Sequence, residues 1–336
     1  MVRIGIIGAG RMGNSHANNL KLIKDAQLTA VYDINPEKAT AFVEKFPGVR
    51  ICNSAAEVAE AADVDMVLVT SPTYVHEEGV MAIMKTGKPI FCEKPLCRTR
   101  EQLARLAPLI KSYSNLFAIG FVRRYSPATM VMKDLVASGK IGKPICASVN
   151  CTFGGFKREW GDWFADYAKS GGAPLDMLAH HCDLINMMLG KPKTVYAQSL
   201  MLSPKAEKPA DYVSCTAVCP NGVIVNLECS WLRSGPSATY MDIYGDKGTL
   251  RLSDANGVEF FAVGNPTPEK MSIDEGLTGQ LQEVISGGMY AIEMGTLIDC
   301  VKNGAKPRAT ADDAINAMDF CLAMLDSTET GKVIEL

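Results

Sequence analysis

The sequence lacks an excess of basic charge and lacks long apolar runs. Its 336 residues include 34 lysines and arginines against 37 aspartates and glutamates, so the formal net charge is −3. Nucleic acids and anionic membranes attract basic surfaces, so we expect neither as a partner. No run approaches the roughly 20 apolar residues that cross a membrane. Met1 leads into a strand pattern instead of a basic and then apolar export segment, so we expect a cytoplasmic protein.

The sequence also has few features of a metal or disulfide protein. It contains only four histidines, and its eleven cysteines are an odd number with no Cys-x-x-Cys pair among them. The adjacent His180 and His181 would point about 100° apart on a helix, so they do not form a clamp. We therefore expect free thiols in a reducing compartment and no metal.

Short apolar runs alternate with amphipathic segments in the first third of the chain. This rhythm is typical of β-α-β units around a parallel sheet. The predicted strands are 3–7, 28–32, 66–70, 90–92 and 116–119. The predicted helices are 14–24, 36–45, 55–61, 76–86 and 99–113, where apolar residues recur every three or four positions.

The pattern changes after Phe121, so we predict two domains, 1–121 and 122–336. Two helices are predicted at 127–138 and 174–189, separated by a strand at 144–152. Alternating runs at 194–200, 212–218, 223–230, 239–244, 249–252 and 258–261 are joined by hairpin turns, which predicts a largely antiparallel sheet. Helices at 281–302 and 311–328 complete the chain. The predicted fold class is α/β, a doubly wound parallel sheet followed by an α/β domain on a large, mostly antiparallel sheet.

A glycine-rich turn joins the first predicted strand to the first helix. Gly8, Gly10 and Gly13 fit G-x-G-x-x-G, the pattern that brings a dinucleotide pyrophosphate close to the backbone at a helix N-terminus, with Arg11 and Met12 between them. Asp33 follows the second strand 20 residues after Gly13, where a carboxylate can accept hydrogen bonds from ribose hydroxyls. The same charge repels a 2′-phosphate, so we predict NAD as cofactor in preference to NADP.

Two further places carry residues suited to catalysis. Lys94 lies between Glu93 and Pro95 directly after the strand 90–92, at the sheet edge where ligands of doubly wound folds bind. Asp176, His180 and Asp183 recur at i, i+4 and i+7 and share one face of a helix. A carboxylate one turn before His180 can orient the imidazole for acid-base chemistry. A solvated face or core packing is the alternative reading of both patterns.

The chain resembles the glucose-fructose oxidoreductase, inositol dehydrogenase and MocA-like family of nicotinamide-dependent sugar and polyol oxidoreductases. Six motifs carry the resemblance in order: GIIGAGRMG, TSPTYVHEE, CEKPLCRT, GFVRRYSPA, SGGAPLDMLAHHCDLINMMLG and AIEMGTLIDCVKNGAKPRATADDA. The resemblance implies a homodimer or homotetramer that forms through the second-domain sheet. It also implies a cis Lys94–Pro95 peptide bond, which relatives often have.

By the same resemblance, Lys94 matches the family's catalytic lysine, and Asp176 and His180 match its substrate-helix pair. Positions implied to line the nicotinamide and its ribose are Thr70, Ser71, Pro72, His76 and Glu93. The implied chemistry is hydride transfer from a carbinol carbon, with His180 or Lys94 taking the hydroxyl proton. Candidate contacts to a sugar or polyol are Arg123, Arg124, Tyr125, Trp160, Trp163, Asp183 and Tyr290, besides the catalytic residues.

Two alternatives to a polyol dehydrogenase remain open. One is an NADPH-dependent reductase of a keto-sugar or a small carbonyl compound, which Asp33 disfavours. The other is a non-catalytic NAD-binding sensor, which would have no need of Lys94 and His180. The sequence does not identify the sugar or polyol, because loop residues read the stereochemistry of ring hydroxyls and one fold serves many substrates.

Overall fold

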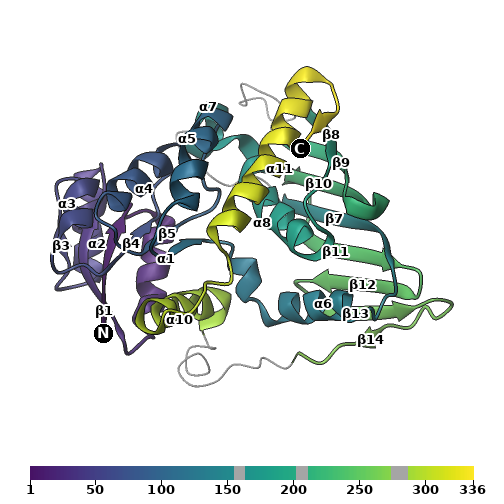
Figure 1. Cartoon of the computed structure of the whole chain (residues 1–336), viewed down its shortest axis with the longest axis horizontal. Helices are drawn as coiled ribbons and strands as arrows, with labels where there is room; N and C mark the ends of the chain where they lie inside the picture. Colours follow the sequence, from purple (N-terminus) through teal and green to yellow (C-terminus); the bar gives the residue numbers. More distant parts are fainter. Residues whose placement is uncertain (155–162, 202–210, 274–286) are drawn as a thin grey trace. The chain divides into compact units, whose positions relative to one another are not determined.

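The computed structural model describes residues 1–154, 163–201, 211–273 and 287–336. These residues fall into two compact units, each assembled from segments that are distant in the sequence (Figure 1). Unit 1 consists of residues 1–125 and 276–315, and unit 2 of residues 126–275 and 316–336. The sequence analysis predicted two continuous domains, 1–121 and 122–336, with a single boundary. The division of functions between these two domains stays a prediction.

Unit 1 contains a parallel sheet of six strands in the order β3-β2-β1-β4-β5-β6. The strands are β1 (Val2–Ile7), β2 (Ala26–Tyr32), β3 (Arg50–Ile51), β4 (Met66–Val69), β5 (Ile90–Cys92) and β6 (Phe117–Ile119). The prediction of a parallel sheet is confirmed, and five of these strands overlap the predicted ones. The two-residue β3 was missed because two residues are too short for an alternating pattern to be visible.

Helices cover both faces of this sheet. They are α1 (Arg11–Leu20), α2 (Pro36–Lys45), α3 (Ala55–Glu60), α4 (His76–Met84), α5 (Arg100–Lys111) and α10 (Gly288–Asn303). Ile4 and Ile6 of β1 belong to a core shared with α1, α2 and α10. Gly5, which points to the opposite face, lies so close to Val58 of α3 that a Cβ would be 2.5 Å from its side chain. Alternate residues of one strand thus pack against different helix layers.

Helix α10 explains why unit 1 is discontinuous. Ala291, Met294, Leu297 and Ile298 are buried in the same core as α1 and the parallel strands. Residues 281–286 of the helix predicted at 281–302 lie outside the described residues, and the remainder matches α10. No local sequence pattern specifies which sheet a late helix will cover.

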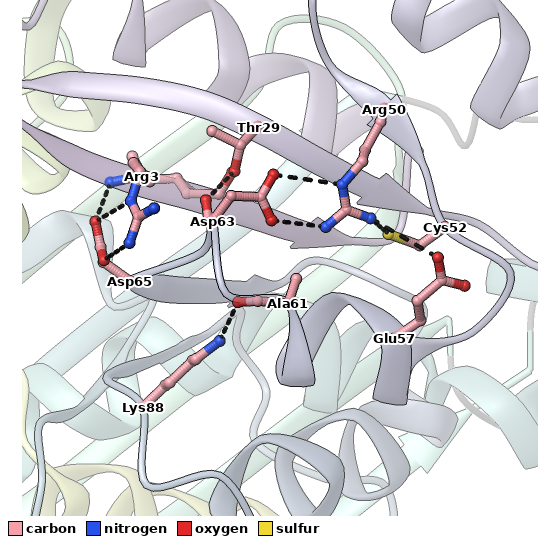
Figure 2. A network of polar contacts seen from close by, with 10 residues as sticks. Arg3, Thr29, Arg50, Cys52, Glu57, Ala61, Asp63, Asp65 and Lys88 are labelled. Atoms are coloured by element: carbon pink, nitrogen blue, oxygen red, sulfur yellow. Dashed lines mark hydrogen bonds and ion pairs between the residues drawn. The ribbon is translucent and has the colours of Figure 1, made fainter.

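The amino-terminal edge of the parallel sheet is held by a polar network (Figure 2). Arg3 of β1 forms a two-pronged contact with Asp65, at 2.6 and 3.0 Å. Arg50 of β3 donates in the same way to Asp63, at 2.8 and 3.3 Å. These hydrogen bonds lower the pKa of both carboxyl groups. The network ties strand starts together at the end of the sheet opposite the glycine turn.

Unit 2 is built on nine strands in the order β14-β13-β12-β11-β7-β10-β9-β8-β15. Only β7 and β10 run parallel among its neighbouring pairs, which confirms the mostly antiparallel prediction. The strands are β7 (Pro144–Gly154), β8 (Thr194–Leu200), β9 (Tyr212–Val218), β10 (Ile224–Arg233), β11 (Ala238–Gly245), β12 (Gly248–Ser253), β13 (Gly257–Ala262), β14 (Glu269–Lys270) and β15 (Ile334–Glu335).

The described α-helices of unit 2 are α6 (Pro127–Ala137), α7 (Tyr167–Ser170), α8 (Gly172–Leu189) and α11 (Ala311–Thr330), whose first residues belong to unit 1. Helix α6 contacts β12 and β13 of the sheet. Helix α8 contacts β7, β9 and β10, where Val149, Cys215 and Leu227 are buried. It begins at Gly172, two residues before the predicted start, and ends before Gly190 as predicted. Among the described residues, no helix is long and apolar enough to cross a membrane.

Candidate cofactor and catalytic site

The predicted cofactor residues of unit 1 lie at the carboxyl ends of neighbouring strands. Gly8 follows β1, Asp33 follows β2, Thr70 follows β4 and Glu93 follows β5. Because the strand order is β2-β1-β4-β5, these residues line one sheet edge in the order Asp33, Gly8, Thr70, Glu93. The order of strands reverses between β1 and β4, which is where doubly wound folds bind their ligands.

The three glycines of the turn meet different surroundings. Gly8 has a φ of +108°, and a Cβ there would lie 2.4 Å from the backbone nitrogen of Ser71. A Cβ at Gly13 would lie 2.1 Å from the carbonyl oxygen of Gly8. A Cβ at Gly10 would meet nothing within 4 Å. The first two glycines are therefore required by the protein's own packing, whereas Gly10 leaves one side of the turn open to a ligand.

The start of α1 fits an anionic group. Gly10 caps the helix without a side-chain hydrogen bond, and its first turn has no acidic residue. The first N–H groups of a helix have no partner within the helix and attract phosphate oxygens. Thr70 Oγ1 donates to the Gly8 carbonyl oxygen at 2.6 Å, and Asn14 Nδ2 donates to the Ala9 carbonyl oxygen at 2.8 Å. These bonds hold the turn in place from both sides.

Asp33 is oriented by the same turn. Its Oδ2 accepts a hydrogen bond from the backbone N–H of Ala9 at 2.8 Å, and its Oδ1 accepts one from Asn35 at 2.9 Å. Each carboxylate oxygen has a second acceptor position. The carboxylate can therefore accept ribose hydroxyls while it stays attached to the glycine turn.

His76 connects the loops that follow β4 and β5. Its Nε2 lies 2.8 Å from the carbonyl oxygen of Ser71, and its Nδ1 lies 2.9 Å from that of Pro95. Burial lowers the pKa of this imidazole, although both carbonyl contacts act in the opposite direction. His76 was predicted to line the cofactor site, and its position indicates that it holds the two loops of that site.

Glu93, the first residue of the Glu93–Lys94–Pro95 turn, is a buried acid. Glu93 is 5% exposed, its Oε1 lies 2.6 Å from Nε2 of His16, and its Oε2 accepts the backbone N–H of Lys94 at 3.1 Å. The Lys94–Pro95 peptide bond is cis, as the resemblance implied. The sequence analysis did not identify His16 as a contact of Glu93. The sequence feature that could have indicated it is a histidine three residues after Gly13, the last glycine of the turn.

The other predicted residues are distributed over both units. Asp176 and His180 of α8 are half-buried, and Asp183 of the same helix is buried. Arg123 is half-buried, and Tyr125 is buried beneath the Arg308 guanidinium at 5.6 Å. Trp163 and Tyr290 are half-buried, and Trp160 lies outside the described residues. Their roles as substrate contacts stay predictions.

The glycine turn, the carboxylate after β2 and the strand order thus define a dinucleotide-binding Rossmann domain, of the class found in NAD-dependent oxidoreductases. The family model described as "Oxidoreductase family, NAD-binding Rossmann fold" matches residues 2–121, and the GFO/IDH/MocA C-terminal domain model matches residues 129–251. The chain belongs to the Gfo/Idh/MocA oxidoreductase family.

Curated relatives match over the whole chain. Inositol 2-dehydrogenase 3 of Saccharopolyspora erythraea is 29% identical over 99% of this chain and 95% of its own length. Myo-inositol 2-dehydrogenase of Thermotoga maritima is 28% identical over 100% of this chain and 98% of its own length.

Solved structures share the fold. A probable dehydrogenase from Thermotoga maritima superposes with a TM-score of 0.82 at 26% identity, covering 99% of this chain and 98% of that one. Scyllo-inositol dehydrogenase of Lactobacillus casei, solved with NAD(H) and scyllo-inositol, superposes with a TM-score of 0.83 at 24% identity, covering 100% and 99%. The second likeness concerns the fold alone.

Proposed function

We propose that the chain is an NAD-dependent dehydrogenase that oxidises a hydroxyl group of inositol or a related polyol or sugar. The observation that carries the proposal is the order Asp33, glycine turn, Thr70, Glu93–Lys94 along one sheet edge. A dinucleotide whose ribose binds Asp33 and whose pyrophosphate binds the turn extends from there toward β4 and β5. Lys94 follows β5 directly and is the charged residue suited to the reacting end.

NAD, when bound, supplies the acceptor for the hydride that leaves the carbinol carbon. The chain must remove the hydroxyl proton and stabilise charge on the oxygen. We assign the proton to His180, whose imidazole Asp176 orients from one helical turn away. Lys94 hydrogen-bonds the reacting oxygen and stabilises negative charge that develops there. Arg123, Trp163, Asp183 and Tyr290 are assigned to the ring hydroxyls and ring faces of the substrate.

Inositol is favoured because both curated relatives described above are inositol 2-dehydrogenases. The residue types on α8 agree with this class, since carboxylates and imidazoles accept and donate hydrogen bonds to a ring bearing many hydroxyls. The same chemistry suits a pyranose. The proposal is therefore a substrate class, with inositol as its first member.

The proposal includes assembly through the nine-stranded sheet. Paired residues on one sheet face point the same way, and on the face away from α8 these include Tyr196, Leu200, Ile224 and Tyr244. Between 37% and 54% of each of these side chains is exposed. Exposed apolar side chains on a sheet face favour a subunit contact. We also propose a cytoplasmic location, supported by eleven cysteines that are all free thiols.

The direct test is NADH formation by the purified protein, followed by absorbance. Inositol isomers, aldoses and sugar acids are supplied in turn, with NAD and NADP in parallel. We expect turnover with at least one inositol or pyranose and tighter binding of NAD than of NADP in a fluorescence titration. Binding of NAD without turnover on any polyol would favour a sensor. Equal or tighter binding of NADP would contradict the role of Asp33.

A further inference from the structure

Helix α10 carries a carboxyl group in the interior of unit 1. Glu293 is 0% exposed, and within the part of the chain that the structure describes neither of its carboxyl oxygens has a hydrogen-bond partner. Its neighbours on the helix, Ala291, Met294 and Leu297, pack in the apolar core. An ionised carboxylate without partners costs several kcal/mol in such surroundings. The carboxyl group of Glu293 is therefore held in its neutral, protonated form.

Glu293 belongs to a cluster beneath the Glu93–Lys94 turn. Tyr290 lies one helical turn before Glu293, on the same side of α10. The Tyr290 ring meets the edge of the His16 ring at a centroid distance of 5.9 Å, and His16 contacts Glu93 at 2.6 Å. Helix α10 packs against α1, η2 (Val122–Tyr125) and β1. Titratable groups of these elements and of the β5 turn are Arg3, Arg11, His16, Glu93, Lys94, Arg123, Arg124 and Tyr125.

Glu93 and Glu293 differ in the contacts that would stabilise a negative charge. Two carboxyl groups that act on each other in a buried site do not both ionise. Glu93 has partners that stabilise a carboxylate, the His16 ring and the Lys94 N–H, whereas Glu293 has none. Burial first, and then the charge of Glu93, raise the pKa of Glu293 well above its usual range.

The tautomer of His16 follows from the same contacts. Its buried Nδ1 has no hydrogen-bond partner among the described residues, so a proton on that atom would be unsatisfied. The neutral tautomer with its proton on Nε2 donates to Glu93 and leaves Nδ1 as an unprotonated nitrogen.

We propose that Glu293 and Glu93 form a buried acid pair that holds one proton and one negative charge, with Glu93 ionised and Glu293 neutral. Glu293 is the neutral member, and the negative charge of the pair lies on Glu93, next to Lys94. The effect of that charge at the reacting end rests on the proposed function. A single fixed negative charge next to the reacting end favours the cationic ring of NAD over the neutral ring of NADH.

The protonation of Glu293 is tested without substrate or cofactor. An acid whose pKa is raised in the folded state binds its proton there while the unfolded chain, with an ordinary glutamate pKa of about 4.3, has lost it. Stability is full below that value and falls as pH rises toward the folded pKa. Glu293→Gln, a neutral isostere, removes this loss. Its folding equilibrium constant relative to wild type should rise by up to tenfold per pH unit in this window.

Urea unfolding of both proteins between pH 5 and pH 9 measures this ratio. Glu293→Leu serves as a second neutral variant if the glutamine variant does not fold, and Glu335→Gln, at the chain terminus, is the matched surface control. A ratio that is constant or falls with pH would show that Glu293 is ionised in the folded protein and would overturn the proposal. Infrared spectra provide a second measure, since Glu293→Gln should remove a protonated carboxyl band and leave the carboxylate bands.

The charge on Glu93 is tested by cofactor titration. Glu93→Gln should lower the affinity for NAD more than the affinity for NADH, by about tenfold in their ratio, which corresponds to about 1.4 kcal/mol. Glu293→Gln, which replaces a neutral group with another, should leave the ratio unchanged. A shifted ratio in the second variant would place the charge on Glu293 and contradict the assignment. Because these titrations need no polyol, a wrong substrate class would not affect them.

Discussion

At the scale of single residues, the groups proposed for catalysis differ in burial from the groups that hold the loops of the cofactor edge. Thr70, His76 and His16 are all buried, and each bonds to the backbone or side chain of a neighbouring loop at the cofactor edge. Lys94 and His180, in contrast, are more exposed. A proton-transfer group must reach its substrate, whereas a supporting group is most effective when packing restricts its rotamers.

We predict that Lys94→Ala and His180→Ala each lower the turnover number by at least about a hundredfold, the usual size of an acid-base contribution. The affinity for NAD should change little, because the phosphate and ribose contacts are assigned to other residues. Steady-state rates and a fluorescence titration of each variant measure both quantities. Wild-type turnover in either variant would remove that residue from the mechanism. Lys133→Ala, on the surface of α6, is the control.

The support residue His76 should make stability dependent on pH. Its pKa is lowered in the folded state, so the stability that it contributes is present above the ordinary histidine pKa of about 6.5 and is lost as pH falls toward the folded value. The melting temperature of the wild type should therefore fall between pH 7 and pH 5.5. His76→Asn, which does not titrate, should show a smaller fall over the same range. An equal fall in both proteins would assign the effect to other groups.

At the scale of elements, the turn between β1 and α1 combines two requirements on glycine. Gly8 is needed because the backbone of the next loop is too close for a Cβ, and Gly13 because the carbonyl oxygen of Gly8 is too close. Gly10 is needed only if a ligand approaches. The sequence motif treats all three alike. The structure separates them, because only Gly10 borders open space.

This separation predicts opposite effects of two alanine substitutions. Gly10→Ala should fold with a melting temperature near that of the wild type, since its φ of −74° suits alanine, and should lower NAD affinity by at least about tenfold. Gly13→Ala should lower the free energy of unfolding by about 1 to 3 kcal/mol, because its Cβ would overlap the Gly8 carbonyl. Differential scanning fluorimetry with and without NAD distinguishes the two. Wild-type affinity in Gly10→Ala would argue against the pyrophosphate site.

At the scale of the whole molecule, the nine-stranded sheet has one face that the helices of the described residues do not cover. Ile224 and Tyr244 lie in one row across it, because both pair with Cys146 of the intervening strand. We predict that the protein forms a dimer or tetramer of its 36.2 kDa chain in solution. Ile224→Lys combined with Tyr244→Lys should shift the mass measured by light scattering toward a single chain. Leu109→Lys, an equally exposed site on α5, should not.

Much of unit 1 could be predicted from the sequence because its signals are local. The glycine turn, the carboxylate after β2 and the lysine before a proline each sit a fixed number of residues from a strand end, and the strand pattern is visible in the apolar runs. Most predicted elements of unit 2 were also found, since alternation and hairpin turns are properties of neighbouring residues.

The sequence by itself determined the fold class, the family and the positions of the chemical groups, because helix and strand periods, turn residues and motifs act over a few neighbouring residues. Tertiary structure alone decided that α10 completes the first unit, that Gly10 differs from Gly8 and Gly13, and that Glu293 lies in the cluster with Glu93 and His16. These features depend on contacts between residues up to about 280 positions apart. Such contacts form only when packing brings distant segments together.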